Sequence, residues 1–173
     1  NNQGRGPGQY QGITDFDVSD DGKTLVLNFS KSIFSYSVNE TGFNHLSSIK
    51  LEQPVQFVSF VPGTNNILLS SSSDYGNEKA LNVAINMDGD TLSLKPNFYT
   101  YTRSESYKVY SANDVCQYKS GDQVFFKEVW SDTVFTVSKE SSIFIPSLIL
   151  DSRGTVIKTK MRSDADYLNS QKG

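Results

Sequence analysis

The chain has 173 residues, with 36% hydrophobic and 20% charged side chains and a net charge of −3 at pH 7. Aromatic residues make up 12% of it, which excludes a disordered tail, because such a chain can bury enough apolar surface to offset the entropy cost of folding. The 16 basic residues are outnumbered by 19 acidic ones, which excludes a nucleic-acid binder that works through bulk positive charge.

The chain contains one cysteine, Cys116, and one histidine, His45. An internal disulfide is therefore impossible, and zinc sites built on several cysteines or histidines are excluded. We expect Cys116 to be a small buried side chain and His45 to lie on an exposed strand face. No run approaches 18 apolar residues, so no membrane-spanning helix is expected. The chain begins at Asn1 without a methionine or a signal-peptide pattern, which predicts a processed or truncated product.

Period-two alternation of apolar and polar residues predicts β-strands along most of the chain. The first runs over residues 13–18 and is followed by an Asp-Gly hairpin turn at residues 20–23, since Asp-Gly accepts the positive φ of a tight turn. The further predicted strands, in chain order, cover residues 24–29, 32–38, 43–51, 55–61, 66–70, 80–86, 91–94, 107–118, 123–129, 133–138, 143–150 and 155–160.

These strands recur in groups of four. Residues 25–27 match residues 67–69 at an offset of 42, and Tyr36 and Val38 match Val83 and Ile85 at an offset of 47. A four-strand unit with this spacing is typical of propeller blades. We therefore predict an all-β fold, a single domain over residues 1–173 that forms a partial β-propeller of four-stranded antiparallel blades. About three blades are expected, at residues 12–51, 53–100 and 107–160, with a frayed tail at 161–173. A β-sandwich of about twelve strands is the alternative.

An incomplete ring has a physical consequence. Propellers protect their strand edges by radial closure, usually with about 4 to 8 blades. Three blades leave an open rim with apolar faces exposed, which favours association. We therefore expect the chain to belong to a larger ring whose second half is missing here, or to associate with itself.

The N-terminal segment resembles a known family. Its motif is followed by the strand at residues 13–18 and reads Gly4-Arg5-Gly6-Pro7-Gly8-Gln9-Tyr10. This is similar to a segment common in the six-bladed, NHL-type β-propeller family of Bacteroidetes envelope proteins, with Gln9 where glutamate is more usual. Residues 126–135 and 145–151 resemble the same family less specifically. The resemblance implies six blades, of which this chain is about half, and an envelope location, either periplasmic or secreted and in some members lipid-anchored. It implies little about activity.

Two polar segments and one indole are candidates for ligand binding. Asp74, Tyr75 and Asn77 lie in the longest polar loop, where a ring and polar groups suit a sugar. Tyr101 and Arg103 lie in an irregular aromatic stretch that could line a groove. Trp130, at a strand–turn junction, is a candidate contact for a partner. The alternatives are a solvated loop for the first group and packing between blades for the other two.

Several carboxylates have spacings that resemble functional sites. Asp15 and Asp17 share one side of a strand and suit acid–base chemistry, although solvated or loop-capping roles are expected instead. Asn86, Asp88 and Asp90 have the spacing of a calcium loop, but Asp88-Gly89 favours a hairpin turn.

The functional expectation follows from these candidates. We predict a non-enzymatic envelope propeller that binds a glycan, a peptide or a protein, with no cofactor, no metal and no nucleic-acid partner. The alternative is an NHL-like lactonase or lyase with a metal in the central channel. Its metal would need inward carboxylates, for which Asp15, Asp74 and Asp114 are the candidates.

Overall fold

The computed structural model describes residues 12–73, 76–101, 115–128 and 131–151. Twelve strands in these ranges form three four-stranded antiparallel sheets, each in simple sequential order. The first sheet is β1 (Asp15–Val18), β2 (Thr24–Phe29), β3 (Ser32–Asn39) and β4 (Gly42–Lys50). The second is β5 (Phe57–Phe60), β6 (Ile67–Ser70), β7 (Ala80–Ile85) and β8 (Thr91–Pro96). The third is β9 (Val115–Ser120), β10 (Gln123–Glu128), β11 (Thr133–Val137) and β12 (Phe144–Ile149).

Each sheet is a meander of hairpins whose turns follow from the sequence. Gly22 has a φ of +71° between β1 and β2, and Gly89 has a φ of +93° between β7 and β8. Both are the glycine of an Asp-Gly pair, and glycine adopts this left-handed conformation without a steric penalty. The two predicted Asp-Gly turns are therefore confirmed.

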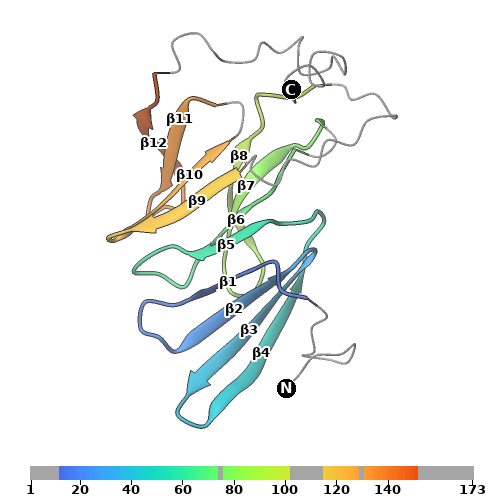
Figure 1. Ribbon diagram of the computed structural model, residues 1–173, viewed down its shortest axis with the longest axis vertical. Helices are drawn as coiled ribbons and strands as arrows, with labels where there is room; N and C mark the ends of the chain where they lie inside the picture. The colour runs from blue at the N-terminus through green and yellow to red at the C-terminus, as the bar shows by residue number, and fades with distance from the viewer. Residues whose placement is uncertain (1–11, 74–75, 102–114, 129–130, 152–173) are drawn as a thin grey trace, which may run out of the picture.

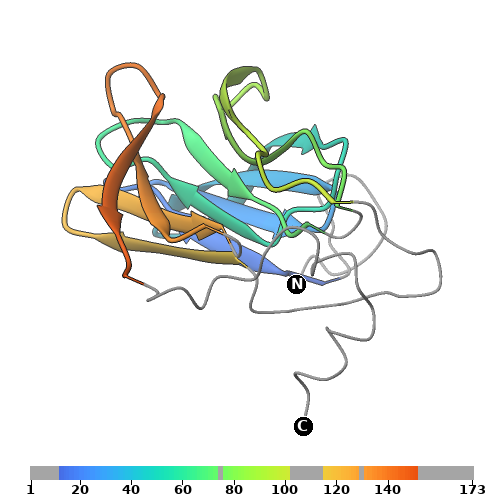
Figure 2. The same ribbon diagram turned by 90° about the horizontal axis from the view of Figure 1, so that it is seen from above.

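The three sheets stand side by side, with the second between the other two (Figure 1). Their first strands, β1, β5 and β9, lie next to one another along one side of the molecule, as Figure 1 shows. The last strands, β8 and β12, rise on the opposite side (Figure 2). This radial arrangement of sequential four-stranded sheets is that of propeller blades. The predicted blade architecture is confirmed, and the β-sandwich alternative is wrong, because the strands form three sheets rather than two facing layers.

Two apolar clusters hold the sheets together. The cluster between the first and second sheets is the larger and comprises Val26, Ile33, Val55, Val58, Phe60, Ile67, Leu69 and Ile85. The cluster between the second and third sheets comprises Val61, Leu68, Val124, Phe126 and Val137. The second sheet is thus buried on both faces, which explains why β6 is buried at all four of its positions.

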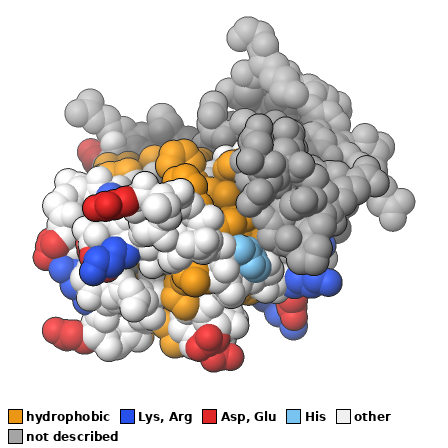
Figure 3. Space-filling view, turned by 90° about the horizontal axis from the view of Figure 1, so that it is seen from below, with side chains coloured by type: hydrophobic (Ala, Val, Ile, Leu, Met, Phe, Trp, Pro, Cys, Tyr) orange, Lys and Arg blue, Asp and Glu red, His pale blue; other side chains and the backbone are white. Residues whose placement is uncertain are grey.

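The outer faces of the first and third sheets keep exposed apolar side chains. Phe16 and Phe43, both 62% exposed, lie on the first sheet, and Tyr118, 46% exposed, lies on β9 of the third. Figure 3 shows apolar surface gathered beside the histidine on one such face. Exposed patches of this kind are typical of surfaces that another element covers.

Some predictions concern residues for which no structure is described. The predicted strand at 107–118 corresponds to β9 only from Val115 onward, and the strand at 155–160 and the tail at 161–173 lie outside the described ranges. No helix in those ranges has the length and apolar character that a membrane span requires.

Candidate functional site

A groove opens between the second and third sheets on the side of their last strands. Its volume is about 370 Å³, and β8 with the segment that follows it forms one wall, while β11, β12 and the turn between them form the other. We call it the β8–β12 groove. Most of its lining is apolar or aromatic: Leu94, Pro96, Phe98, Tyr99, Phe135, Ile143, Phe144 and Pro146; its polar lining residues are Ser93, Lys95, Ser131 and Thr133. Open grooves that combine aromatic walls with a few polar groups are common ligand sites.

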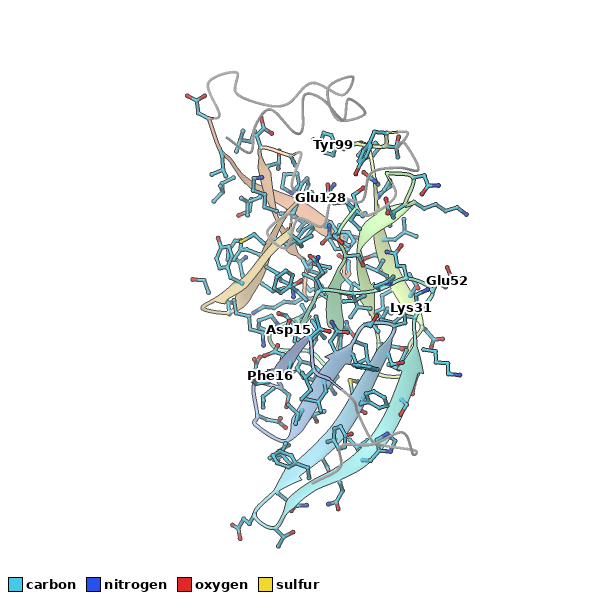
Figure 4. The ribbon with its side chains drawn as sticks, turned by 45° about the vertical axis from the view of Figure 1, so that its right-hand side comes forward. Asp15, Phe16, Lys31, Glu52, Tyr99 and Glu128 are labelled. Carbon is cyan, nitrogen blue, oxygen red and sulfur yellow. The ribbon has the colours of Figure 1, made fainter. Side chains whose placement is uncertain are left out.

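A buried ion pair lies at the inner end of this groove. Lys95 Nζ lies 2.6 Å from Glu128 Oε2, and the two side chains are only 7% and 2% exposed. Lys95 occupies a position on β8 whose cross-strand partner on β7 is Asn82, so its side chain points toward the third sheet. The Lys95 ammonium also lies 4.5 Å from the centre of the Phe135 ring. Figure 4 shows Glu128 among the side chains between the second and third sheets.

The ion pair continues into a chain of buried polar groups. Asn82 Nδ2 donates to Glu128 Oε1 at 2.9 Å. The Ser70 hydroxyl lies 2.7 Å from Asn82 Oδ1 and 2.5 Å from Gln117 Oε1, so its one proton is shared between two amide oxygens. These contacts run from β8 through β7 and β6 to β9. A buried ion pair is stable only where such additional hydrogen bonds compensate its loss of hydration.

A second polar arrangement joins the inner strands β1 and β5. The backbone N–H groups of Val58 and Phe60 donate to the carboxylates of Asp15 and Asp17 at 2.8 and 2.7 Å. Because β5 is the edge strand of its sheet, these N–H groups lack a strand partner, and the carboxylates replace it. Lys119 of β9 completes the arrangement with an ion pair to Asp17 at 2.5 Å.

This finding corrects the sequence interpretation of Asp15 and Asp17. They are neither solvated nor loop caps, but connect the first sheet to the second. Partial burial raises the pKa of the Asp15 carboxyl, and the hydrogen bond from Val58 opposes that shift. Asp15 is labelled in Figure 4 beside Phe16, its neighbour on β1, whose side chain leaves the opposite face of the sheet.

The structure brings two of the predicted ligand-binding segments together. Tyr101 donates its backbone N–H to Gly76 O at 2.8 Å and its hydroxyl to Ser73 O at 3.0 Å. The tyrosine therefore fastens the polar loop, and Asn77, which is exposed, follows this contact directly. Asp74, Tyr75, Arg103 and Trp130 lie outside the described residues. A ligand role for the six residues stays a prediction.

The two predicted metal arrangements differ in outcome. Asn86 Oδ1 accepts the backbone N–H groups of Asp88 and Asp90 at 3.0 and 2.8 Å, so this oxygen supports the hairpin turn, as the favoured interpretation predicted. In the channel arrangement, Asp15 accepts the Val58 N–H, and Asp74 and Asp114 lie outside the described part of the chain. Among the residues that the structure describes, no three histidine, cysteine or acidic side chains gather to hold a metal ion.

The lone cysteine and the lone histidine are both exposed. Exposure of Cys116 contradicts the prediction that it is buried. Its cross-strand partner is Lys127, whereas the neighbouring Phe126 packs toward the second sheet, so Cys116 occupies the face that no described sheet covers. His45 is exposed, as predicted, and lies 2.9 Å from Ser48 Oγ.

Sequence reasoning missed the Lys95–Glu128 pair. Lysine and glutamate on a strand normally indicate a solvated face. Nothing in the local pattern distinguishes Lys95, between Leu94 and Pro96, from an exposed lysine. The only available signal was the alternation of β10, where Val124, Phe126 and Glu128 share one side of the strand.

Three sequential four-stranded antiparallel sheets, arranged radially with their first strands together, define part of a β-propeller. A family model described as a 6-bladed beta-propeller matches residues 1–160. The chain belongs to that family, which confirms the six-bladed propeller resemblance noted in the sequence.

Solved structures agree on the fold. A crystal structure of a predicted exported protein from Bacteroides fragilis is similar with a TM-score of 0.70 and 18% identity, over 97% of this chain and 48% of that one. The structure of U3-55K matches with a TM-score of 0.52 and 13% identity, over 82% of this chain and 38% of that one. The RRP9 WD40 repeats match with a TM-score of 0.51 at the same identity and coverage. The chain thus spans less than half the length of these proteins. No curated protein matches it.

Proposed function

We propose that the chain is a non-enzymatic interaction module of a six-bladed propeller and that it holds its ligand in the β8–β12 groove. The observation that carries this proposal is the open, mostly apolar cavity of about 370 Å³ between the second and third sheets. Tyr99 lines this groove, and Tyr101, two residues later, fastens the loop that contains Asn77. The groove and the predicted binding loop therefore lie on neighbouring segments of the chain.

The partners of three acidic groups, Asp15, Asp17 and Glu128, support a binding role over acid–base catalysis at these positions. Asp15 and Asp17 accept backbone N–H groups of the next sheet, and Glu128 is engaged by Lys95 and Asn82. A general acid or base needs a proton-transfer partner in its substrate, whereas these carboxylates already accept hydrogen bonds from protein groups.

Binding to peptide and glycan arrays tests the proposal. Phe98 lines the groove and is 76% exposed, so Phe98→Ser leaves the core intact. Ile13, 44% exposed before β1, provides the control variant Ile13→Ser. We expect array signals that Phe98→Ser abolishes and Ile13→Ser preserves. Absence of any signal with the wild-type chain, or equal losses in the two variants, would count against a binding groove.

We also infer that the open flanks of the first and third sheets are covered by further propeller blades, supplied by additional sequence of the same protein or by a second copy of this chain. The exposed rings of Phe16, Phe43 and Tyr118 motivate this inference. The chain studied by itself is then expected to self-associate, and a monodisperse monomer in multi-angle light scattering would contradict it.

An extracytoplasmic location is part of the same proposal. The similarity in fold to a predicted exported protein supports it, and a lipid anchor is the finer version that the family resemblance implies. Fractionation of the native host, with release by detergent but not by osmotic shock, separates the anchored form from a soluble periplasmic one. Recovery in the cytoplasm would refute both.

A further inference from the structure

We infer that the occupant of the β8–β12 groove is an apolar peptide segment and that Lys95 donates a hydrogen bond to one of its backbone carbonyl oxygens. The inference rests on the proposed function, because it names the ligand class of that groove. Three observations carry it: the donor capacity of Lys95, the charge balance at the inner end of the groove, and the hydrogen bonds already made by the polar side chains of its walls.

The first observation is that the Lys95 ammonium has N–H groups that no described residue accepts. An ammonium group carries three N–H donors, and only one acceptor among the described residues, Glu128 Oε2, lies within hydrogen-bond distance of it. The rings of Phe135 and Phe98 lie 4.5 and 5.8 Å from the same nitrogen. The side chain is 7% exposed and lines the groove. A ligand oxygen that enters the groove therefore meets a buried cation with two N–H groups to offer.

The second observation concerns charge. Glu128 already neutralises Lys95, and the pair is buried. A ligand carboxylate would bring a second negative charge into this poorly hydrated space, where an uncompensated charge is costly. A neutral acceptor gains a hydrogen bond from a charged donor without that cost. Peptide carbonyls and sugar hydroxyls both satisfy this condition.

The third observation separates these two. The hydroxyl groups on the walls are engaged within the protein: Ser93 donates to Ser142 O, Thr133 donates to Asp132 Oδ1, and Ser131 Oγ accepts the Thr133 N–H at 3.0 Å. Apart from Tyr99 and Lys95, the remaining wall residues are apolar, so a sugar with several hydroxyls to satisfy would meet few polar partners there. Apolar side chains fit such walls, and the peptide needs its hydrogen bond at only one place.

A direct test uses two neutral probes and one charged probe. These are N-acetyl-leucyl-phenylalaninamide, the same peptide with a free carboxylate in place of the amide, and maltotriose. Binding is measured by titration calorimetry, and the Lys95 signals are followed by NMR in chain labelled with ¹³C and ¹⁵N at lysine. We expect the amide to bind and to shift the Lys95 resonances, the carboxylate to bind less tightly, and maltotriose neither to bind nor to compete.

Variants isolate the contribution of Lys95. The double variant Lys95→Met/Glu128→Gln removes both charges and approximately keeps the volume. Its matched control, Lys139→Met/Asp122→Asn, removes an exposed ion pair of similar length. The control should bind the amide as the wild type does, and the Lys95 double variant should lose about tenfold or more in affinity. Should the Lys95 double variant fail to fold, the Lys95 resonances of the wild-type chain decide the question.

The outcomes that overturn the inference are distinct from failure of the groove itself. Unchanged amide affinity in the Lys95 double variant, or absence of a Lys95 shift, would remove the role of Lys95. Tighter binding of the carboxylate would refute the neutral acceptor, and binding of maltotriose in its place would identify a glycan site. Array binding that depends on Phe98 would survive each of these results and leave the proposed function intact. No binding of the amide to the wild-type chain would overturn the inference as stated.

Discussion

The two interfaces between neighbouring sheets are built differently. The first and second sheets meet through a large apolar cluster, with the carboxylates of Asp15 and Asp17 bound to backbone N–H groups at its inner end. The second and third sheets meet through a smaller cluster, the buried Lys95–Glu128 pair and the β8–β12 groove. The first of these interfaces leaves a polar pocket of about 270 Å³ between hairpin turns, lined by Ser19, Asp20, Asp21, Gly63, Thr64 and Asn65. The second leaves a mostly apolar groove beside a buried ammonium group. The two described junctions thus share a backbone plan but differ in the chemistry of the space between their sheets.

The largest expected loss of stability comes from removing one partner of the buried ion pair, which, of the two described interfaces, only the one between the second and third sheets contains. Glu128→Leu leaves the Lys95 ammonium buried without its partner, and should lower the free energy of unfolding by about 3–5 kcal/mol. Urea denaturation measures this loss. Lys95→Met/Glu128→Leu removes both charges and should recover most of the stability; a double variant as unstable as the single one would contradict the charge explanation.

A smaller loss of stability is expected at the interface between the first and second sheets. Asp17→Ala removes the acceptor of the Phe60 N–H and the partner of Lys119, and should cost about 1–3 kcal/mol because a donor at a strand edge is left unpaired. Asp17→Asn keeps an acceptor oxygen and should cost less. The two free energies of unfolding, from the same denaturant series, would be equal if the backbone hydrogen bond were unimportant.

A loss of stability similar to that of Asp17→Ala is expected from a change in the loop beside the groove. A Cβ added to Gly76, whose φ is +79°, would overlap the Tyr101 carbonyl oxygen. Gly76→Ala should therefore destabilise the loop by about 1–3 kcal/mol and increase hydrogen exchange at the Tyr101 amide. Gly121→Ala is the control, since its φ is also positive but nothing lies within 4 Å of the added Cβ. Similar exchange at Tyr101 in both variants would show that the contact does not hold the loop.

The smallest expected effect is a change in how stability depends on pH, caused by Asp15 at the interface between the first and second sheets. Burial raises the pKa of Asp15 above its usual value of 3.8, so the folded state binds a proton more readily than the unfolded state. The contribution of Asp15 to stability therefore falls as the pH rises from 3.8 through the raised pKa. Asp15→Asn keeps an acceptor for Val58 and loses this dependence, so it should gain on the wild type between acidic and neutral pH. Parallel stability–pH curves would exclude the effect.

The fold could be predicted from the sequence because its signals are local. Alternation along 13–18 and the Asp-Gly pairs at Gly22 and Gly89 specify strands and hairpin turns without reference to distant residues, and the recurrence of groups of four strands indicates blades. The candidate site depends instead on which faces meet. Asp17 and Phe60 are 43 residues apart, and Lys95 and Glu128 are 33 apart, so their partnership is decided by blade packing. Cys116 was misjudged for the same reason, because its environment depends on what covers the third sheet.

The ion pair between Lys119 and Asp17 has a mechanical consequence. It joins the first and third sheets directly, across the inner strand of the second. The outer strands have a polar link of their own, because the Ser93 hydroxyl on β8 donates to the Ser142 carbonyl oxygen in the turn before β12. The spacing of the three sheets is thus set by polar links at their outer strands as well as at their inner ones.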